Sequence, residues 1–446
     1  MENTSSLYGK EKILKIFIKI APPVMLAQLI QALYNIVDSL FVGNYSSDGL
    51  TALSIVYPIQ LLMIALAVGS GVGINTRIAY ALGLKKSNEA NDYAGVGTPL
   101  AFVLWLIFAV AMYFVMPYFA EISTDSPNVI QEIIIYGRIV CVFSFGIFFE
   151  SIWTKILQAN GDMKTPMLAQ IVGAIVNIIF DPILIFGLFG LKEMGIAGAA
   201  IATTLGQVVA ALIVMKKALR KVPKIKLITS YLKNIYISGI PNILMQSAYT
   251  FYILGLNLIL SRFSDQAVTA LGLYYKWQTF FFIPLGSLQT CMVPVVSYNY
   301  AVKDIERCKK ILNVCLLLGL CLMSIGTLFF ETIPSQMLRV FSNDQEVIRI
   351  GTIGFRFIGI SFIPQVTSLI YPVFFQAVNY PIRSSLLTII RTVVLFVPLG
   401  YLFSKIGLNY FWLTFVLTET LTTIVGYVFY RYFLKKNSQY LKKDQL

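Results

Sequence analysis

The chain alternates between long apolar runs and short polar breaks along its whole length. Runs of about 20 apolar residues are long enough to cross a bilayer as α-helices. The pattern predicts an all-α integral membrane protein with twelve transmembrane helices, at 13–42, 49–82, 92–117, 129–158, 165–188, 195–219, 230–261, 267–300, 309–330, 346–377, 381–404 and 410–434.

A second pattern is an internal repeat at an offset of 218 residues (241 − 23). Matching positions include Pro23 and Pro241, Gln28 and Gln246, Tyr34 and Tyr252, Thr51-Ala52-Leu53 and Thr269-Ala270-Leu271, and Gln158-Ala159 and Gln376-Ala377. The chain is therefore two copies of one unit of roughly 220 residues, a pattern typical of transporters. Each copy has an even number of helices, so we expect both to cross the membrane in the same direction, related by an axis along the membrane normal. The predicted parts are a six-helix lobe at 1–219, a cytoplasmic basic linker at 220–229, a second six-helix lobe at 230–434 and a cytoplasmic tail at 435–446.

Composition agrees with a lipid environment and narrows the chemistry. Apolar residues make up 57% of the chain and charged residues 13%, with a mean hydropathy of +0.75, whereas soluble chains carry about 25% charge. There is no histidine, which removes the commonest general base and metal ligand. The five cysteines form no CxxC pair. These features favour a transporter over an enzyme, and we expect no cofactor.

Basic residues fall mainly on one side of the predicted membrane. Most of the 35 Lys and Arg residues lie in the N-terminal segment, in the loops after even-numbered helices and in the tail, whereas the opposite loops contain only Lys192, Arg262, Arg339, Arg349 and Lys405. The positive-inside rule then predicts that both termini are cytoplasmic. We interpret the basic run between the halves as a topology determinant and linker, so we expect no nucleic-acid partner.

The predicted first helix carries a polar stripe that ends in an acid. Gln28, Gln31, Asn35 and Asp38 are spaced three, four and three residues apart, so they share one helical face. Ionisable residues inside membrane helices are costly and usually face a cavity or a partner. Asp38 is therefore a candidate site residue. The alternative is an acid hydrated at the helix end, because Asn44 follows within two turns.

The predicted fifth helix contains a second polar group. Asn177 and Asp181 are four residues apart and share a face, and Pro182 leaves the carbonyl of Ile178 without its helical partner. A carboxylate, an amide oxygen and a free carbonyl are ligands suited to Na⁺, and the acid alone can take a proton. The alternative is a structural Asn/Asp pair that ties helices together.

The predicted sixth helix begins with small residues. Gly198, Ala199 and Ala202 permit close helix contact, which would bring the Thr203 hydroxyl against the fifth helix. Thr203 or Thr204 is therefore a further candidate ligand, and the rest of this segment is interpreted as packing.

The other charged residues inside the predicted spans each allow more than one role. Glu150 lies little more than a turn from Lys155, so an internal ion pair and a cation-binding acid are both open. Arg391 and Lys276 can face a cavity or snorkel to the cytoplasm, and snorkelling is favoured for Arg391. Glu419 is assigned no role.

The repeat fails where the candidate residues lie. Asp38 aligns with Leu256, Asn177 with Leu395 and Asp181 with Leu399. The backbone plan is duplicated but the ionisable chemistry is not, which indicates that these polar residues are not scaffold. One acidic half and one aromatic, apolar half suit a cavity for a bulky organic cation.

Four segments carry a resemblance to a known family: Tyr34-Asn-Ile-Val-Asp38-Ser-Leu-Phe-Val-Gly43, Gln158-Ala-Asn-Gly161-Asp162-Met-Lys-Thr-Pro166, Asn177-x3-Asp181-Pro182, and Gly195-x2-Gly198-Ala-Ala-x-Ala-Thr203. In this order and spacing they resemble the multidrug and toxic compound extrusion (MATE) family, and most closely its bacterial MepA-like efflux branch. The resemblance covers essentially the whole chain.

The resemblance implies the MOP-type transporter fold, with a V-shaped pair of six-helix lobes, and export of cationic amphiphilic drugs against Na⁺ or H⁺. It places the coupling-cation site on Asp38, Asn177, Asp181 and Thr203, with a possible Na⁺ at the first three. A second-lobe cation site is not expected, because the matching positions there are Leu, Tyr and Gln.

The predicted function is a multidrug efflux antiporter that works by alternating access in a bacterial cell membrane. Its expected partners are organic cations and the lipid bilayer, and we expect a monomer. The predicted substrate-cavity residues are Gln28, Gln31, Tyr34, Asn35, Glu150, Gln246, Tyr249 and Gln278. The main alternative is a flippase or exporter of lipid-linked saccharides from the same superfamily. A flippase would need basic residues for phosphates, for which Arg391, Lys276 and Lys155 are available.

Overall fold

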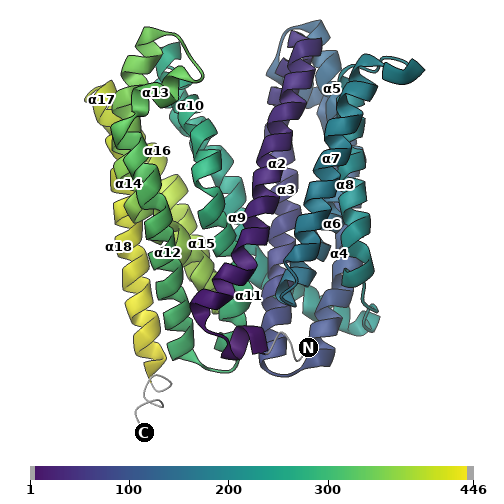
Figure 1. Ribbon diagram of the computed structural model, residues 1–446, viewed down its shortest axis with the longest axis vertical. Coiled ribbons are helices and arrows are strands. Elements are labelled where there is room, and N and C mark those ends of the chain that lie inside the picture. Colours follow the sequence, from purple (N-terminus) through teal and green to yellow (C-terminus); the bar gives the residue numbers. More distant parts are fainter. Residues whose placement is uncertain (1–5, 439–446) are drawn as a thin grey trace. The chain divides into compact units, whose positions relative to one another are not determined.

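The computed structural model describes residues 6–438, which fold as helices joined by short connections (Figure 1). In this part of the chain ten helices are long and apolar enough to cross a membrane, and two bent helix pairs bring the number to twelve when each pair is one span. The predicted all-α membrane fold is therefore confirmed. The predicted tail lies outside the described residues from residue 439 onward.

The described residues form two compact units that do not follow sequence order throughout. The first unit is Pro22–Gly239, and the second joins residues 6–21 to residues 240–438. The helices α2 (Ile13–Tyr45) and α9 (Ile225–Leu260) each begin in one unit and continue into the other. The two crossing points, after residues 21 and 239, are themselves 218 residues apart (239 − 21).

The first unit also contains five further spans. They are α3 (Ser47–Gly83), α4 (Ser87–Ser123), the bent pair α5 (Pro127–Val142) and α6 (Phe145–Ala159), α7 (Lys164–Phe186) and α8 (Ile196–Ala218), with a short 3₁₀ turn η2 (Leu188–Gly190) before α8.

The second unit has the same order of spans. They are the bent pair α10 (Asp265–Phe281) and α11 (Ile283–Ala301), α12 (Ile305–Thr332), α14 (Gln345–Ala377), a composite span of α15 (Pro381–Ile389), the π-helix η3 (Ile390–Phe396) and α16 (Val397–Ser404), and α17 (Leu408–Phe411) with α18 (Leu413–Lys436). A π-helical turn η1 (Ser6–Lys10) precedes α2, and α13 (Pro334–Arg339) is a short helix before α14.

Two spans that the sequence pattern predicts as single helices are bent. The axes of α5 and α6 differ by 41° and those of α10 and α11 by 51°. At the first bend the Ser144 hydroxyl donates to the Cys141 carbonyl at 2.6 Å, a local bond that competes with the helical ladder. At the second, Pro284 lies in the first turn of α11 and cannot donate to α10. The repeat-equivalent spans, α14 and α3, are continuous.

The repeat extends to the backbone of the turns. Lys85 after α3 and Lys303 after α11 both have left-handed φ angles, of 60° and 63°. Gly161 after α6 and Asn379 after α14 form a second such pair, at 84° and 62°. A left-handed residue is the usual way to end a helix and to satisfy its last carbonyls. The duplicated unit has therefore kept its chain reversals even where it has changed its chemistry.

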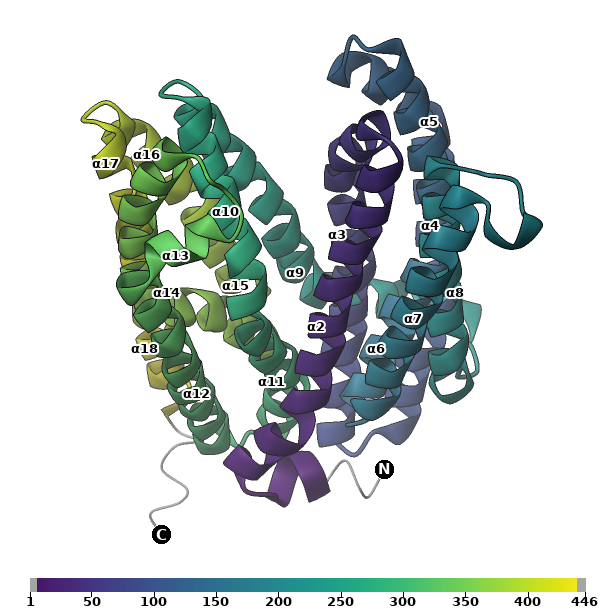
Figure 2. The same cartoon turned by 45° about the horizontal axis from the view of Figure 1, so that its top comes forward.

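The helices α7 and α8 lie side by side in the first unit (Figure 2). A Cβ on Gly173 would lie 2.7 Å from the carbonyl oxygen of Gly206, and a Cβ on Gly206 would lie 2.6 Å from that of Gly173. A Cβ on Gly198 would meet the backbone of Leu184. The two backbones touch because these positions have no side chain, which confirms the predicted close contact of the fifth and sixth spans.

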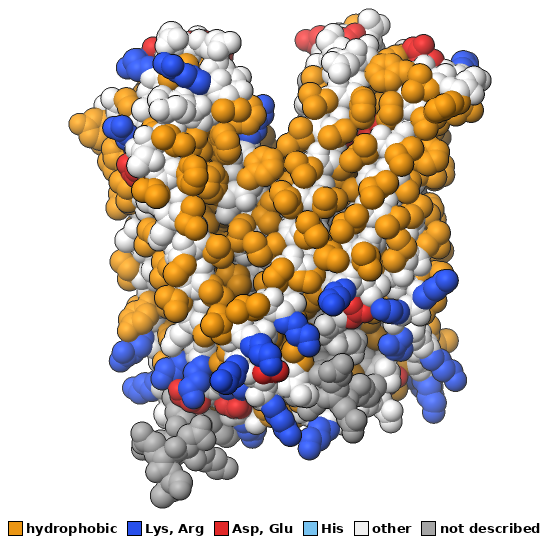
Figure 3. All heavy atoms as spheres, viewed as in Figure 1, with side chains coloured by type: hydrophobic (Ala, Val, Ile, Leu, Met, Phe, Trp, Pro, Cys, Tyr) orange, Lys and Arg blue, Asp and Glu red, His pale blue; other side chains and the backbone are white. Residues whose placement is uncertain are grey.

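The surface is that of a membrane protein. Hydrophobic side chains cover the helices along their middle parts, and in each unit Lys and Arg gather near one end (Figure 3). Exposed large apolar residues such as Ile18, Ile107 and Leu258 lie on these helices. This distribution places the apolar surface in lipid and the basic residues at an interface, so the chain is a multi-pass membrane protein.

Candidate functional site

Four of the predicted site residues meet inside the first unit. The amide Nδ2 of Asn177 donates to Asp181 Oδ1 at 3.2 Å and reaches Thr203 Oγ1 at 3.5 Å. The carboxyl groups of Asp38 and Asp181 are neighbours that interact electrostatically. Their residues come from α2, α7 and α8, and all four are buried, with exposed fractions between 0% and 8%. We call Asp38, Asn177, Asp181 and Thr203 the acidic cluster.

Local sequence explains how the acidic cluster forms. Asn177 and Asp181 are one helical turn apart, so their side chains lie on the same face of α7. Gly206 has no side chain, and a Cβ there would lie 3.3 Å from the Cβ of Asn177. This lets α8 approach α7 closely enough for Thr203 to reach the amide. Asp38 is 7% exposed and its carboxyl group interacts with that of Asp181, which is not the position of a hydrated acid at a helix end.

The acidic cluster has more acceptors than donors. Within the described part of the chain, the buried atoms Asp38 Oδ1, Asn177 Oδ1 and Asp181 Oδ2 accept no hydrogen bond. Buried oxygen atoms without a partner are costly. Two neighbouring carboxyl groups also cannot both stay ionised cheaply unless a positive charge lies near them. The arrangement therefore suits a proton shared between the acids or a small cation bound by their oxygens.

The remaining polar residues on α2 are more accessible. Gln28, Gln31 and Tyr34 are half-buried, and Asn35 is exposed. The structure brings only Asp38 of this stripe into the acidic cluster. The others continue along the same helix towards its start.

Glu150 on α6 lies in a separate polar group of the first unit. Its Oε1 accepts hydrogen bonds from the Thr154 hydroxyl at 2.7 Å and from Gln170 Nε2 at 2.9 Å. The Lys155 ammonium donates to Gln158 Oε1 at 3.0 Å. A hydroxyl and an amide thus surround a carboxylate that is 6% exposed.

In the second unit, the predicted cavity residues form a neutral, aromatic group. Tyr249 donates from its hydroxyl to Gln278 Oε1 at 3.0 Å, and Gln246 donates to Asn242 Oδ1 at 3.5 Å. The rings of Tyr249, Tyr252 and Tyr275 lie with centroids 5.3 to 6.5 Å apart. We call these three tyrosines the tyrosine cluster.

The second unit also contains an ion pair that the sequence interpretation missed. The prediction that Arg391 snorkels towards the cytoplasm is wrong, because its side chain is buried against Glu419. Its Nη2 donates to Glu419 Oε1 at 2.7 Å and its Nε to Glu419 Oε2 at 3.0 Å. Arg391 is 7% exposed and Glu419 is fully buried. The Ser368 hydroxyl also donates to Glu419.

The signal for this pair was present in the sequence. An arginine in the middle of a span needs a partner, and Glu419 is the one acid among the buried residues described for the second unit. Lys276, in contrast, is exposed, and its ammonium lies 5.1 Å from the centroid of the Phe341 ring, in the connection between α13 and α14.

The motif around Asp162 forms the turn between α6 and α7. Asp162 accepts hydrogen bonds from the Thr165 backbone N–H at 3.0 Å, from the Thr165 hydroxyl at 2.7 Å and from the Lys217 ammonium at 3.3 Å. Burial acts to raise the pKa of the Asp162 carboxyl, but these hydrogen bonds outweigh it and the pKa is lowered. This motif is therefore a helix start, fixed by capping.

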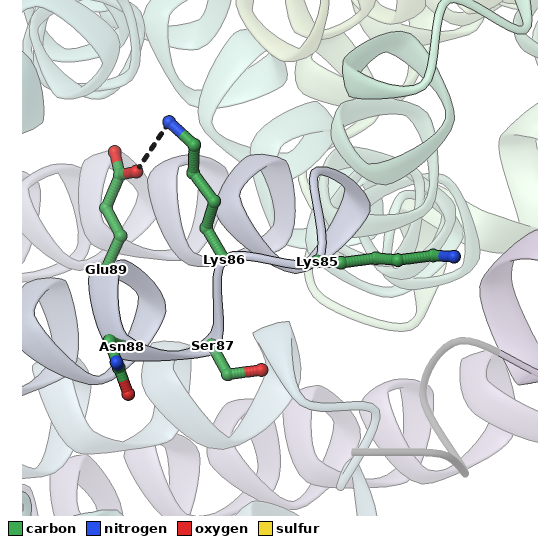
Figure 4. A pocket seen from close by; sticks show the side chains of 5 residues that line it. All are labelled: Lys85, Lys86, Ser87, Asn88 and Glu89. Carbon is green, nitrogen blue, oxygen red and sulfur yellow. Dashed lines mark ion pairs between the residues drawn. The ribbon is translucent and has the colours of Figure 1, made fainter.

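A depression at the turn between α3 and α4 contains no comparable chemistry. It is lined by consecutive residues, Lys85 to Glu89, and the Lys86 ammonium pairs with Glu89 at 3.3 Å (Figure 4). The Lys85 side chain points away from this pair. The depression follows from the shape of the turn.

Comparison with known families and proteins agrees with the sequence resemblance. The MatE family model matches residues 23–183 and 241–402, which is once in each half. A second family model, "Lipid II flippase MurJ", matches residues 130–261.

Individual relatives are distant but cover most of the chain. The "Multidrug export protein MepA" of Staphylococcus saprophyticus is 22% identical over 94% of both chains. The "FAD transporter" of Shewanella oneidensis is 22% identical over 88% of this chain and 89% of its own. A solved MOP superfamily transporter from Pyrococcus furiosus superposes with a TM-score of 0.90 over 99% of both chains, at 22% identity. At this identity the superposition demonstrates a common fold.

Proposed function

The chain belongs to the MatE family of transporters, and from this membership we propose that it is a multidrug efflux antiporter. It exports cationic amphiphilic compounds in exchange for Na⁺ or H⁺ by alternating access. Both termini are cytoplasmic, the location is the bacterial plasma membrane, and the working unit is a monomer.

The observation that carries the proposal is the acidic cluster. Its two carboxyl groups and one amide present three buried oxygen atoms without hydrogen bonds, next to the Thr203 hydroxyl. Hard oxygen ligands in a buried setting suit Na⁺, and paired acids suit a proton. We propose that these four residues bind the coupling ion.

Charge neutralisation then couples the ion to the drug. An inward-moving cation neutralises Asp38 and Asp181, which weakens their attraction for an organic cation and favours its release outside. For each net positive charge that moves inward per cycle, the membrane potential contributes about 2.3 kcal/mol for every 100 mV, which corresponds to about fiftyfold accumulation. Exchange of one cation for one monovalent compound moves no net charge, and the ion gradient alone then drives export. Proposed substrate contacts are Gln28, Gln31, Tyr34, Asn35 and Glu150 in the first unit and Gln246, Tyr249 and Gln278 in the second.

The alternative function is a flippase for lipid-linked saccharides. It is supported by the MurJ family match at residues 130–261. Phosphate groups need cationic partners, whereas the buried acids of the first unit are Asp38, Glu150 and Asp181. The charge of this unit therefore favours an organic cation as substrate.

Ethidium transport tests the proposal and identifies the ion. Purified protein in proteoliposomes is given an inward Na⁺ gradient at fixed pH, or a proton gradient without Na⁺. We expect ethidium movement with one of these gradients. Absence of ethidium movement with either gradient, combined with flipping of a fluorescent lipid-linked phosphate, would replace the proposal with the flippase.

A further inference from the structure

The buried ion pair of the second unit leaves one edge of an arginine free for a ligand. A planar guanidinium has five N–H donors, which form two edges able to bind a carboxylate through two parallel hydrogen bonds. Glu419 occupies the edge made by Nε and Nη2, at 3.0 and 2.7 Å. Nη1 donates to no atom among residues 6–438, and 8% of the side chain stays accessible.

Two aromatic rings lie next to this guanidinium. The Phe396 and Tyr252 ring centroids lie 5.1 and 5.8 Å from the Arg391 Cζ. These two rings stack on each other, with centroids 4.6 Å apart. In cation–π contacts of this kind the ring attracts the delocalised charge of the guanidinium, so all of its N–H groups stay available as hydrogen-bond donors. The bidentate pair with Glu419 holds the guanidinium in place, and the two rings leave the edge made by Nη1 and Nη2 without a protein acceptor among the described residues.

The helix that carries Arg391 is itself irregular. Arg391 and Phe396 both lie in the π-helix η3, and π-helical turns occur frequently at functional sites. The tyrosine cluster connects this point to the predicted substrate residues. Tyr252 contacts Arg391, Tyr249 contacts Tyr252, and Tyr249 donates to Gln278.

The ion pair includes a residue whose equivalent position in the first half of the repeat is an acid. Ser368, which donates to Glu419, aligns with Glu150 in the first unit (368 − 218 = 150). The same register therefore has a carboxylate bound by neutral groups in the first unit and an arginine-containing pair in the second. Among the described residues that are buried, Arg391 is the one with a permanent positive charge.

We propose that Arg391 binds a carboxylate of the transported compound through its Nη1 and Nη2 edge, while Glu419 remains on the other edge. The substrates then include zwitterionic amphiphiles, which carry a cationic group and an acidic group. This inference rests on the proposed export function and adds a second charge requirement to it.

Two matched dyes test the inference. Rhodamine 123 is the methyl ester of rhodamine 110, so the pair differs in one carboxylate and shares the same fluorophore. Binding of each dye to purified full-length protein is measured by fluorescence anisotropy, for the wild type and for Arg391→Gln/Glu419→Gln. The double variant removes both charges together, so that neither stays buried alone.

We expect the wild type to bind both dyes. In the double variant, affinity for rhodamine 110 relative to rhodamine 123 should fall at least tenfold. A relative affinity that stays the same would identify a purely structural ion pair and overturn the inference, as would a wild type that binds rhodamine 123 only. A wild type that binds neither dye would instead contradict the proposed function.

A conservative variant covers the case in which the double variant does not fold. Arg391→Lys keeps the charge but lacks the two-pronged edge. It should weaken rhodamine 110 binding more than rhodamine 123 binding, and an equal effect on both dyes would also overturn the inference.

Discussion

Replacing Asp181 by asparagine tests the acidic cluster most directly. Asp181→Asn keeps the size of the side chain and removes its charge, so the packing of α7 against α8 is retained. Ethidium export driven by the coupling ion should be lost, while the protein still purifies as a folded membrane protein. Asp38→Asn should have the same effect, because the two buried carboxyl groups interact with each other.

The expected size of the effect follows from the contacts. Asp181 Oδ1 accepts from Asn177 at 3.2 Å, and Oδ2 is the buried oxygen available to an ion. A bond to a charged group contributes about 1.5–3 kcal/mol, against about 1 kcal/mol for a neutral one. Replacing the charged ligand by a neutral one therefore costs about 0.5–2 kcal/mol, which at 1.36 kcal/mol per factor of ten weakens ion binding by about twofold to thirtyfold. The amide also has no charge for the coupling ion to neutralise, so we expect ion entry no longer to drive export.

The assay compares ethidium export across a range of Na⁺ concentrations at fixed pH, and across pH without Na⁺. Glu193→Gln is the matched control, since it also turns an acid into an amide. Glu193 lies outside the acidic cluster, where it accepts a hydrogen bond from the Tyr45 hydroxyl at 2.7 Å. Ethidium export by Glu193→Gln should therefore equal that of the wild type. Full export by both Asp181→Asn and Asp38→Asn would refute the role of the cluster.

Three further predictions concern packing, the hydroxyl ligand and a turn. Gly198→Leu should lower the melting temperature, since its Cβ would lie 2.6 Å from the Leu184 oxygen and overpacking costs about 1–3 kcal/mol; Gly272→Ala, with no atom within 4 Å, is the control, and equal shifts would contradict the packing argument. Thr203→Val should raise the half-saturating ion concentration severalfold and Thr203→Ser should restore it; identical values in all three proteins would exclude the hydroxyl as a ligand. The lowered pKa of Asp162 means that its stabilisation is present above the unfolded value of about 3.9 and is lost as pH falls through the lower folded value. The melting temperature of Asp162→Asn should therefore depend less on acid pH than that of the wild type, and parallel curves would show that this carboxyl is not involved.

The sequence predicted the spans well because lipid imposes a simple rule. Each span must be long and apolar, and its polar ends are easy to locate. The hydropathy pattern did not predict the bends at Ser144 and before Pro284, because hydropathy gives the length of a span and not the direction of its helix axis. Pro284 offered a signal for its bend, whereas Ser144 acts through a side-chain bond that many serines in helices make without a bend.

The acidic cluster could be predicted from sequence spacing in part, whereas the ion pair could not. Asn177 and Asp181 are neighbours on one helix, so spacing alone indicated that they meet. Arg391 and Glu419 lie on different helices, 28 positions apart, and single-helix spacing cannot pair them. The high free energy of an unpaired buried arginine is the one argument in the sequence for pairing Arg391 with Glu419.

The exchanged helix starts have a consequence for biogenesis. Residues 6–21 are made before the other described residues but belong to the unit completed by residues 240–438. Residues 6–21 therefore reach their final contacts only after the second half has been inserted. The first unit, in turn, is complete only once residue 239 has been made, well past the basic linker. A gene cut at that linker would thus leave both fragments without a segment they need, and the two halves would have to be co-expressed to mature.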